Sequence, residues 1–365
     1  MNNSIKKILN KLEKNGFEAY VVGGYVRDYL LNITSYDVDI CTNALPKDII
    51  KVFKIKKGVS NYGSIGFKIG KYNYDITTYR EDGEYNNHKP KSIKYIDNLL
   101  IDLKRRDFRI NSICMNSEGK IFDYLNGKED IHNKLVKTIG STNVRLYEDP
   151  VRILRAIRFA IILDFNLDEE ILNFIKNNKD LLKSISYTRK KQELEKILTS
   201  KNAVKGLNYL KDLELLDELE IKYDKIVNVS DILGMWAQME FSLKYQFTKQ
   251  SLTIINQIKE IVSYGKIDIY ILLKYGLYVS LVAGEILGYS REDINKMDKQ
   301  MPIHKISDVK INNNDIMNLL GIDGSPKLRV IYDDIVGEIL KGKVKNNKRD
   351  IKKYIIKKWM WKLDE

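Results

Sequence analysis

Residues 22–39 read VGGYVRDYLLNITSYDVD, and this stretch decides the fold. An apolar run ends at Gly23 and Gly24 and helical spacing follows, which predicts a strand, a tight turn and a helix. A Gly-Gly turn lets the backbone approach a phosphate closely, and the N-terminus of the next helix offers free N–H groups. Arg27 adds a charge-assisted donor in the first helical turn. The stretch therefore favours a phosphate site, although Gly-Gly by itself also fits an ordinary strand–turn–helix junction.

Two carboxylates follow on the next predicted strand. Asp37 and Asp39 are two residues apart, so both leave one face of an extended chain while Val38 and Ile40 point into the core. Adjacent carboxylates repel each other unless a cation lies between them, and Mg²⁺ takes oxygen ligands of this kind together with substrate phosphates. A lone Asp-x-Asp is most often a solvated strand edge. One that begins 13 residues after Gly24 is a more specific signal, and we expect a metal pair there.

Composition bounds the remaining possibilities. The 365 residues carry 62 Lys plus Arg against 49 Asp plus Glu, a net charge of +13, which suits a polyanionic partner but also fits a drift toward Lys-rich composition. Cys41 and Cys114 fit no ligand spacing and indicate a reduced, cytoplasmic location. The N-terminus has no apolar signal-peptide core. Residues 267–289 are interrupted by Lys, Gly and Glu, so we expect a buried helix rather than a membrane span.

The pattern of elements changes near residue 140. Before it, short β-rich runs alternate with helices, and after it the chain reads as helical. A second boundary is expected near residue 301, where a polar stretch separates helical blocks. The predicted strands cover residues 17–22, 36–41, 64–70, 72–79 and 121–124, and the predicted helices of the first part cover residues 25–31, 46–53 and 103–115.

Further motifs extend the pattern along the chain. Residues 105–111 read RRDFRIN, residues 148–159 read EDPVRILRAIRF, and residues 314–321 read NDIMNLLG. With the two motifs above, they resemble the class II tRNA nucleotidyltransferases, the CCA-adding enzymes, within the superfamily of DNA polymerase β. The resemblance is dense to about residue 200, looser in the middle and visible again from residue 308.

The resemblance implies an α+β protein. A nucleotidyltransferase head with a mixed β-sheet would cover residues 1–140, followed by an all-α neck (141–205), body (206–300) and tail (301–365). The implied activity is template-independent addition of CCA to the 3′ end of tRNA from CTP and ATP, with release of pyrophosphate. Mg²⁺ would be held by Asp37 and Asp39, and tRNA by the helical parts.

The resemblance also assigns site residues. Asp37 and Asp39 would be catalytic, and Asp75 falls where the family carries a third acidic residue, although an ordinary strand-edge aspartate fits its position as well. The residues expected to bind the nucleotide are Gly23, Gly24, Arg27, Arg106, Asn111, Asp149, Arg152, Arg155 and Arg158. Arg105, Arg106 and Asp107 are expected to begin a helix.

The motif at residues 148–159 has a physical interpretation of its own. Asp149 and Arg152 are three apart, which places them on one face of a helix. A carboxylate accepts from the amino groups of cytosine and adenine and a guanidinium donates to neighbouring ring acceptors, whereas uracil and guanine would set a carbonyl against the carboxylate. Arg155 and Arg158 continue the same ridge, which suits a triphosphate. The alternative for this helix alone is a surface ladder of ion pairs.

Departures from the family pattern leave alternatives open. Residues 86–90 read NNHKP, so the acid that the family carries there is missing. An enzyme that adds only A or only CC, and a poly(A) polymerase, are the first rivals, and a non-catalytic RNA-binding protein is the second. Residues 341–362 hold ten Lys or Arg and one acid, which fits either a solvated helix face or a tail that contacts phosphates. The sequence does not determine the oligomeric state.

Overall fold

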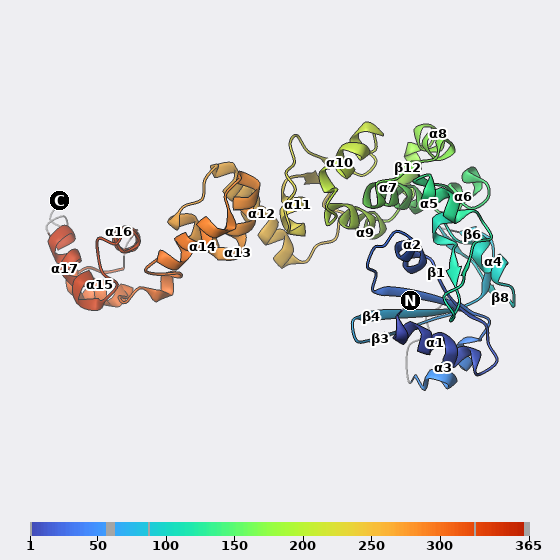
Figure 1. Ribbon diagram of the computed structural model, residues 1–365. Coiled ribbons are helices and arrows are strands. Elements are labelled where there is room, and N and C mark those ends of the chain that lie inside the picture. Colours follow the sequence, from blue (N-terminus) through green and yellow to red (C-terminus); the bar gives the residue numbers. More distant parts are fainter. Residues whose placement is uncertain (1, 56–62, 87, 325, 361–365) are drawn as a thin grey trace. The chain divides into compact units, whose positions relative to one another are not determined.

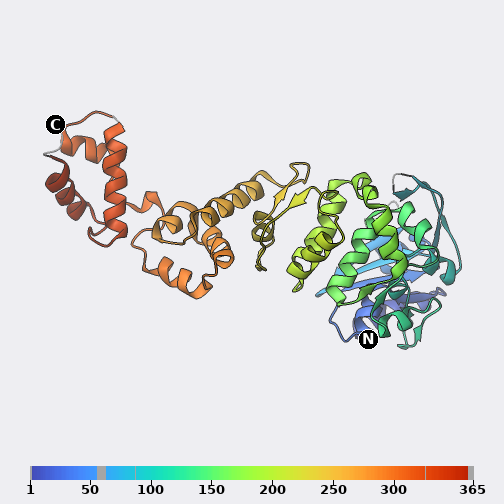
Figure 2. The ribbon, with the colours of Figure 1, turned by 90° about the horizontal axis from the view of Figure 1, so that it is seen from above.

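The computed structural model describes residues 2–55, 63–86, 88–324 and 326–360. The chain forms two compact units, Met1–Glu220 and Ile221–Glu365 (Figures 1 and 2). The boundary between them follows Glu220. The four-part division into head, neck, body and tail stays a prediction.

A six-stranded mixed sheet is the base of the first unit, with the order β10-β9-β1-β2-β4-β3. β2 and β4 are parallel and all other neighbours are antiparallel, as the prediction of a mixed sheet requires. Its strands are β1 (Ala19–Val22), β2 (Asp37–Thr42), β3 (Ser64–Ile69), β4 (Tyr72–Thr78), β9 (Cys114–Met115) and β10 (Ile121–Phe122). Each of the five predicted strands is therefore present, with its ends moved by at most two residues.

The sheet has an apolar face and a polar face along β2. Val38 and Ile40 are fully buried, while Asp37 and Asp39 alternate with them on the opposite face. The apolar face packs against α1 (Asn3–Glu13) and α3 (Pro46–Phe53). The core between them includes Ile5, Ile8, Leu9, Leu12, Val21, Val38, Ile40, Ile49 and Ile76. Burial of this face holds the register of β2, and with it the positions of the two carboxylates.

The polar face is framed by short elements. These are α2 (Gly24–Leu30), the paired strands β5 (Arg80–Asp82) and β8 (Ile93–Tyr95), the paired strands β6 (Tyr85–Asn86) and β7 (Lys89–Pro90), α4 (Leu99–Lys104), η1 (Arg109–Asn111) and α5 (Gly127–His132). The prediction of one helix over residues 103–115 is wrong. Arg105 caps the end of α4 instead of beginning a helix, and the apolar residues after it are buried in a single 3₁₀ turn and in β9.

Helices follow in the first unit from residue 142 onward. They are α6 (Thr142–Glu148), α7 (Val151–Leu163), α8 (Glu169–Asn177), η2 (Lys179–Ser184), α9 (Tyr187–Leu198) and α10 (Ala203–Asp212), and one two-residue parallel pair joins β11 (Leu135–Val136) to β12 (Asn166–Leu167). α7 packs against α9 and α10, and most of its side chains are buried. It is therefore the central helix of this part, not a solvated surface ladder.

The second unit is helical apart from the pair β13 (Ile221–Lys222) and β14 (Glu240–Phe241). Its helices are α11 (Ile232–Ala237), α12 (Lys249–Tyr264), α13 (Ile269–Leu287), α14 (Arg291–Gln300), η3 (Ile306–Asp308), α15 (Asn313–Leu320), α16 (Pro326–Leu340) and α17 (Lys348–Trp359). Among the described residues, α13 alone has the length and apolar composition of a membrane span, a test that a core helix of a soluble protein also passes. It packs between α12 and α14 and is kinked at Gly276.

Candidate active site

A cavity of about 740 Å³ lies in the first unit, on the polar side of the sheet. Eleven of the twelve predicted site residues line it; the exception is Asp75. They come from four separate stretches: the Gly-Gly turn and α2, strand β2, the segment after α4, and α7 with the residue before Pro150. The fold thus brings together motifs that lie more than a hundred residues apart.

The Gly-Gly turn lies against two charged side chains of the site. Gly23 has a φ of 79° at the start of α2, a conformation that residues with a side chain rarely adopt. A Cβ atom there would lie 3.5 Å from Asp39 Oδ2 and 3.6 Å from Arg106 Nη1. Glycine therefore keeps the small space between the carboxylate and the guanidinium open for a ligand.

Three carboxylates, those of Asp37 and Asp39 on β2 and Asp75 on β4, lie near one another. Asp39 and Asp75 are partners across the parallel pair, and Asp75 Oδ1 is buried without a hydrogen-bond partner. Asp39 is exposed to solvent where it opens onto the cavity, and protein lies around the rest of its side chain. Burial raises its pKa, the charges of Asp75 and Asp37 add to the increase, and Arg106 opposes it.

These carboxylates suit a divalent cation. A cation would relieve both the repulsion that raises the pKa of Asp39 and the unpaired oxygen of Asp75. Within the described ranges no three His, Cys, Asp or Glu side chains are already arranged as a closed metal site. The remaining ligands must therefore come from water or from substrate oxygens, which is usual for Mg²⁺.

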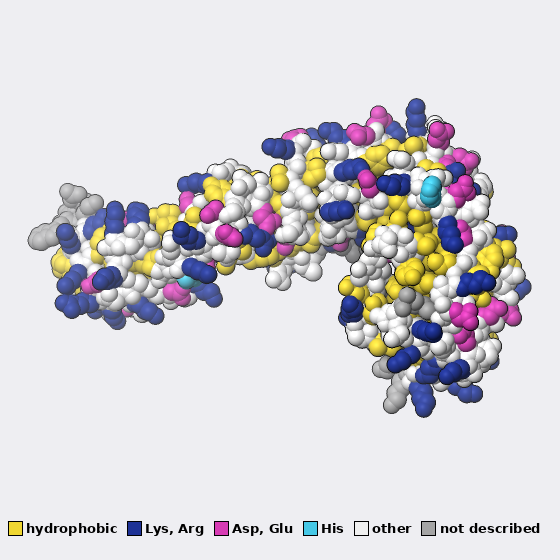
Figure 3. Space-filling model, viewed as in Figure 1, with side chains coloured by type: hydrophobic (Ala, Val, Ile, Leu, Met, Phe, Trp, Pro, Cys, Tyr) yellow, Lys and Arg dark blue, Asp and Glu magenta, His cyan; other side chains and the backbone are white. Residues whose placement is uncertain are grey.

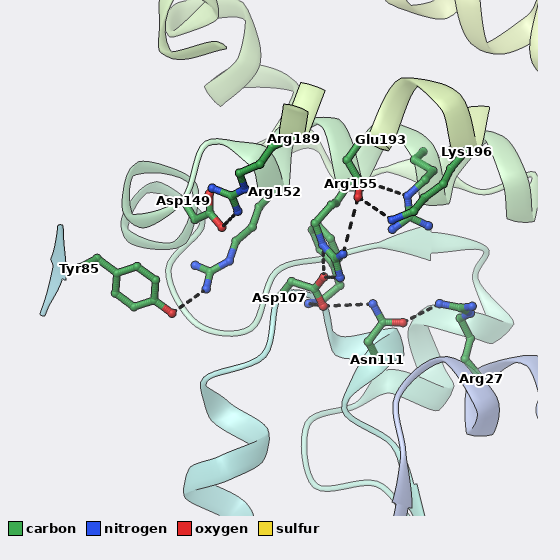
Figure 4. Close-up of polar contacts among 12 residues, drawn as sticks. Arg27, Tyr85, Asp107, Asn111, Asp149, Arg152, Arg155, Arg189, Glu193 and Lys196 are labelled. Carbon is green, nitrogen blue, oxygen red and sulfur yellow. Dashed lines mark hydrogen bonds and ion pairs between the residues drawn. The ribbon is translucent and has the colours of Figure 1, made fainter. Parts of the chain in front are cut away.

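A row of hydrogen bonds joins α2 to α7 (Figure 4). Arg27 Nη1 donates to Asn111 Oδ1 at 2.7 Å, Asn111 Nδ2 donates to Asp107 Oδ1 at 3.1 Å, and Arg155 Nε donates to Asp107 Oδ2 at 2.8 Å. Burial would raise the pKa of Asp107, but the charge of Arg155 and the bond from Asn111 outweigh it, and the pKa is lowered. Asp107 is thus a buried anion that holds Asn111 and Arg155 directly and Arg27 through Asn111.

Asp149 does not lie on the helix that carries Arg152, and the expectation that they share a helical face is wrong. Pro150 caps α7, and Asp149 is extended because the residue before a proline is disfavoured in the helical region. One oxygen of its carboxylate accepts from the Val151 N–H at 3.2 Å. Its other oxygen accepts from Arg189 Nη2 at 2.6 Å. Arg152 donates from Nη2 to the Tyr85 hydroxyl at 3.3 Å. Asp149 and Arg152 therefore both line the cavity, but different neighbouring side chains hold them (Figure 4).

Arg155 and Arg158 do follow Arg152 along one ridge of α7 and line the cavity, as predicted. Phe159 lies beneath them, with the guanidinium carbon of Arg158 4.0 Å from its ring centre and that of Arg27 4.9 Å away. Glu193 of α9 accepts from Arg158 Nε at 2.5 Å. The guanidinium groups are therefore held in place by an aromatic ring and an acid.

Several cavity residues were not predicted from the sequence. They are Arg80, Asp82, Tyr85, His88, Pro90, Arg105, Asp107, Val151, Phe159, Arg189, Gln192, Glu193 and Lys196. Asp107 and Phe159 lie inside motifs that had already been singled out, so their spacing was available as a signal. Arg189 and Glu193 come from α9, whose packing against α7 brings them to the cavity.

Comparison with known proteins places this geometry in a family. Residues 19–137 match the poly A polymerase head domain, and residues 164–223 match the model described as the probable RNA and SrmB-binding site of polymerase A. A CCA-adding enzyme of Geobacillus sp. is 30% identical, with 96% of this chain and 95% of the relative covered. One of Ligilactobacillus salivarius is 31% identical, with 93% of each covered. The chain belongs to the CCA-adding enzyme family.

A solved structure of the family supports the assignment over the whole length. The Bacillus stearothermophilus CCA-adding enzyme in complex with CTP is 25% identical, and the alignment covers 100% of both chains with a TM-score of 0.87. The mixed-sheet head and the helical remainder are thus the fold of a nucleotidyltransferase of this family, and the prediction of the fold class is confirmed.

Proposed function

We propose that this chain adds C, C and A to the 3′ end of tRNA, using CTP and ATP without a nucleic-acid template and releasing pyrophosphate. The observation that carries the proposal is the single cavity in which the carboxylates of β2, the arginines of α7 and Asp149 meet, in a chain of the CCA-adding enzyme family. The separate pieces would each fit an ordinary structural role, but together they provide charge neutralisation and base selection in one place.

In this proposal the 3′-hydroxyl oxygen of the RNA attacks the α-phosphorus of the bound nucleotide. A new O–P bond forms, the bond from the α-phosphorus to the bridging oxygen breaks, pyrophosphate leaves and the hydroxyl proton passes to water. Asp37 and Asp39 would hold Mg²⁺, which when bound activates the hydroxyl and neutralises charge on the leaving group. Asp75, on the neighbouring strand β4, would add its negative charge to the metal site, since one of its oxygens is buried without a hydrogen-bond partner.

The triphosphate would lie against the Gly-Gly turn and the arginines. Gly23 and Gly24 allow close approach of the backbone, and Arg27, Arg106, Arg155 and Arg158 line the same cavity. Asn111 lies between Arg27 and Asp107, a position from which its amide group can bind the ribose. Such transfer depends mainly on positioning and charge neutralisation, which these residues supply.

Asp149 and Arg152 would select the base. Arg189 and the Val151 N–H hold the Asp149 carboxylate in one orientation, as an acceptor for the amino group of cytosine or adenine. Glu148 accepts from Arg152 Nη1 at 2.9 Å and Tyr85 from Nη2, so the guanidinium is also fixed. A rigid pair of this kind rejects uracil and guanine because their carbonyl groups would leave a buried acceptor unpaired.

The second unit would bind the tRNA. Lys and Arg side chains gather over the C-terminal helices on the face shown in Figure 3. By sequence, α17 and the segment before it carry the basic residues Lys343, Lys345, Lys348, Arg349, Lys352, Lys353 and Lys357. Duplex RNA hides its base edges, so contacts to its phosphates and its shape are the expected mode of binding. We place the reaction in the cytoplasm, with no membrane partner.

The proposal is tested with three tRNA substrates that lack CCA, CA or A, each incubated with CTP and ATP and Mg²⁺. The chain should complete all three. Extension of only the last substrate would favour an enzyme that adds A, arrest after CC would favour one that adds CC, and a long A tail would favour a poly(A) polymerase. Binding without extension would favour a non-catalytic RNA-binding protein. The Asp37→Ala variant should bind tRNA normally and extend none of the three.

A further inference from the structure

Asp102, in the short helix α4, is a fully buried carboxylate among basic groups. Its Oδ1 accepts from Arg105 Nε at 2.9 Å and from the backbone N–H of Arg80 at 3.2 Å. Its Oδ2 accepts from Arg106 Nη2 at 3.2 Å. Burial alone would raise the pKa of Asp102, but the charges of Arg106 and Arg105 outweigh it and the pKa is lowered, so the group stays ionised.

Arg106 is held by this carboxylate at one end only. Its Nη1 faces Gly23, where an added Cβ would be 3.6 Å away, and its Nε is buried without a hydrogen-bond partner. A buried donor without a partner costs free energy, and a guanidinium presents its donors as a planar fork. The Nη1 group of Arg106 therefore lies beside the space between the Gly-Gly turn and Asp39, where the cavity opens.

We propose that Asp102 is a positioning residue for nucleotide binding: it holds Nη2 of Arg106 and thereby aims Nη1 at the triphosphate. The proposal rests on the proposed function for the identity of the ligand. Asp102 does not touch the nucleotide and does not line the cavity. Because a triphosphate is common to both substrates, Asp102 acts on CTP and ATP equally and does not contribute to base selection.

A purely structural role is the competing explanation, since Asp102 also anchors β5 through Arg80. The two explanations differ in what they predict for a variant that keeps shape and loses charge. A structural role predicts lower thermal stability with normal nucleotide affinity in the folded protein. A positioning role predicts weaker binding that depends on the presence of Arg106.

The test is a double-mutant cycle on the full-length protein with Mg²⁺, with the Kd for CTP and for ATP measured by calorimetry. Asp102→Asn should raise both Kd values by the same factor, between about tenfold and a hundredfold, as expected for a misplaced charge-assisted contact. Arg106→Gln should raise them at least as much. Adding Asp102→Asn to Arg106→Gln should change them by less than about twofold, because the residue that Asp102 positions is already lost.

Asp130→Asn is the matched control, because Asp130 is a buried carboxylate of the same unit that does not line the cavity, and its variant should bind CTP like wild type. Should Asp102→Asn not fold, Asp102→Glu keeps the charge but moves it along the side chain, and should still weaken both nucleotides. Normal affinity in either folded variant, or additive effects of Asp102→Asn and Arg106→Gln, would overturn the proposal. Failure of wild type to extend tRNA while binding CTP and ATP would overturn the proposed function and leave this test intact.

Discussion

Asp39 and Asp75 lie directly opposite each other on the parallel strands β2 and β4, and one oxygen of Asp75 is buried without a hydrogen bond. Two acids at such a position are costly to the folded protein in the absence of a cation. Their retention makes sense if a metal and a phosphorylated substrate complete the site. The candidate active site is thus a place where the fold gives up stability for a binding function.

The first prediction concerns Asp39→Asn. The pKa of Asp39 is raised in the folded protein, so above that pKa the ionised carboxylate opposes folding, and the penalty disappears below the pKa of the unfolded chain. The variant should therefore have a higher Tm than wild type in metal-free buffer at neutral pH, and no nucleotidyl transfer. Mg²⁺ should raise the Tm of wild type more than that of the variant. A variant less stable than metal-free wild type would contradict this account of the site.

The same shift predicts a pH dependence. A carboxylate binds a cation only when it is deprotonated. The Mg²⁺ concentration needed for half-maximal activity should rise as the pH falls toward the raised pKa of Asp39, and excess Mg²⁺ should restore the rate. An acidic loss of activity that Mg²⁺ does not change would assign the titrating group elsewhere.

The second prediction concerns the buried anion Asp107. Its pKa is lowered, so its contribution to stability is complete above the unfolded pKa and is lost as the pH falls toward the folded one. Asp107→Ala leaves Arg155 without its partner and should reduce the free energy of unfolding by ~3 kcal/mol at neutral pH, the lower end for a broken buried pair because Arg155 is partly exposed. The difference between variant and wild type should shrink in acid denaturation below pH ~4. An equal difference at all pH values would contradict the ion-pair explanation.

The third prediction separates strain from site geometry at glycine. Gly23→Ala and Gly16→Ala each place a side chain at a positive φ, 79° and 85°, and both should cost ~1–3 kcal/mol of stability. Only Gly23 lies against Asp39 and Arg106, while nothing lies within 4 Å of a Cβ at Gly16. Gly23→Ala should therefore also lose CTP and ATP binding, and Gly16→Ala should keep both. Equal affinities in the two variants would show that the turn does not approach the nucleotide.

The fourth prediction concerns base selection. Asp149→Asn replaces an acceptor by a group that can also donate to a carbonyl, and its shape is unchanged. The ratio of kcat/KM for CTP to that for UTP should fall by a factor of about ten to a hundred, because an unpaired buried polar group costs about 1–3 kcal/mol. The measurement is single-nucleotide extension of tRNA with each of the four nucleotides. If the preference for CTP over UTP stayed the same and the rate fell equally for all four nucleotides, Asp149 would have a structural role and no role in base selection.

The sheet was predictable because apolar residues alternate with polar ones along β2 and β4, in short runs bounded by turns. Val38, Ile40 and Ile76 are buried on one face of the sheet. Asp37 and Asp39 must therefore lie on the other face. The predicted helix over residues 103–115 failed because its apolar spacing comes from burial in separate elements. α4 ends at Arg105, and the side chains of Arg105 and Arg106 both donate to Asp102 in that helix.

The supporting side chains of the site were harder to find than the motifs. Arg189 reaches Asp149 across 40 residues and Glu193 reaches Arg158 across 35, and such pairs depend on how α9 packs against α7. The position of Asp149 before α7 is a separate case, because Pro150 is a local signal that disfavours a helical conformation at the residue before it. Motif spacing identified residues that line the cavity, whereas tertiary packing decides which residues hold them in place.

The most direct test of the central claim is the product formed on a tRNA that lacks all three terminal nucleotides, with all four nucleoside triphosphates and Mg²⁺ present, read by sequencing of its 3′ end. The account predicts that C, C and A are added in that order and that extension then stops. An end with U or G, a run of A, or arrest before the final A would contradict it.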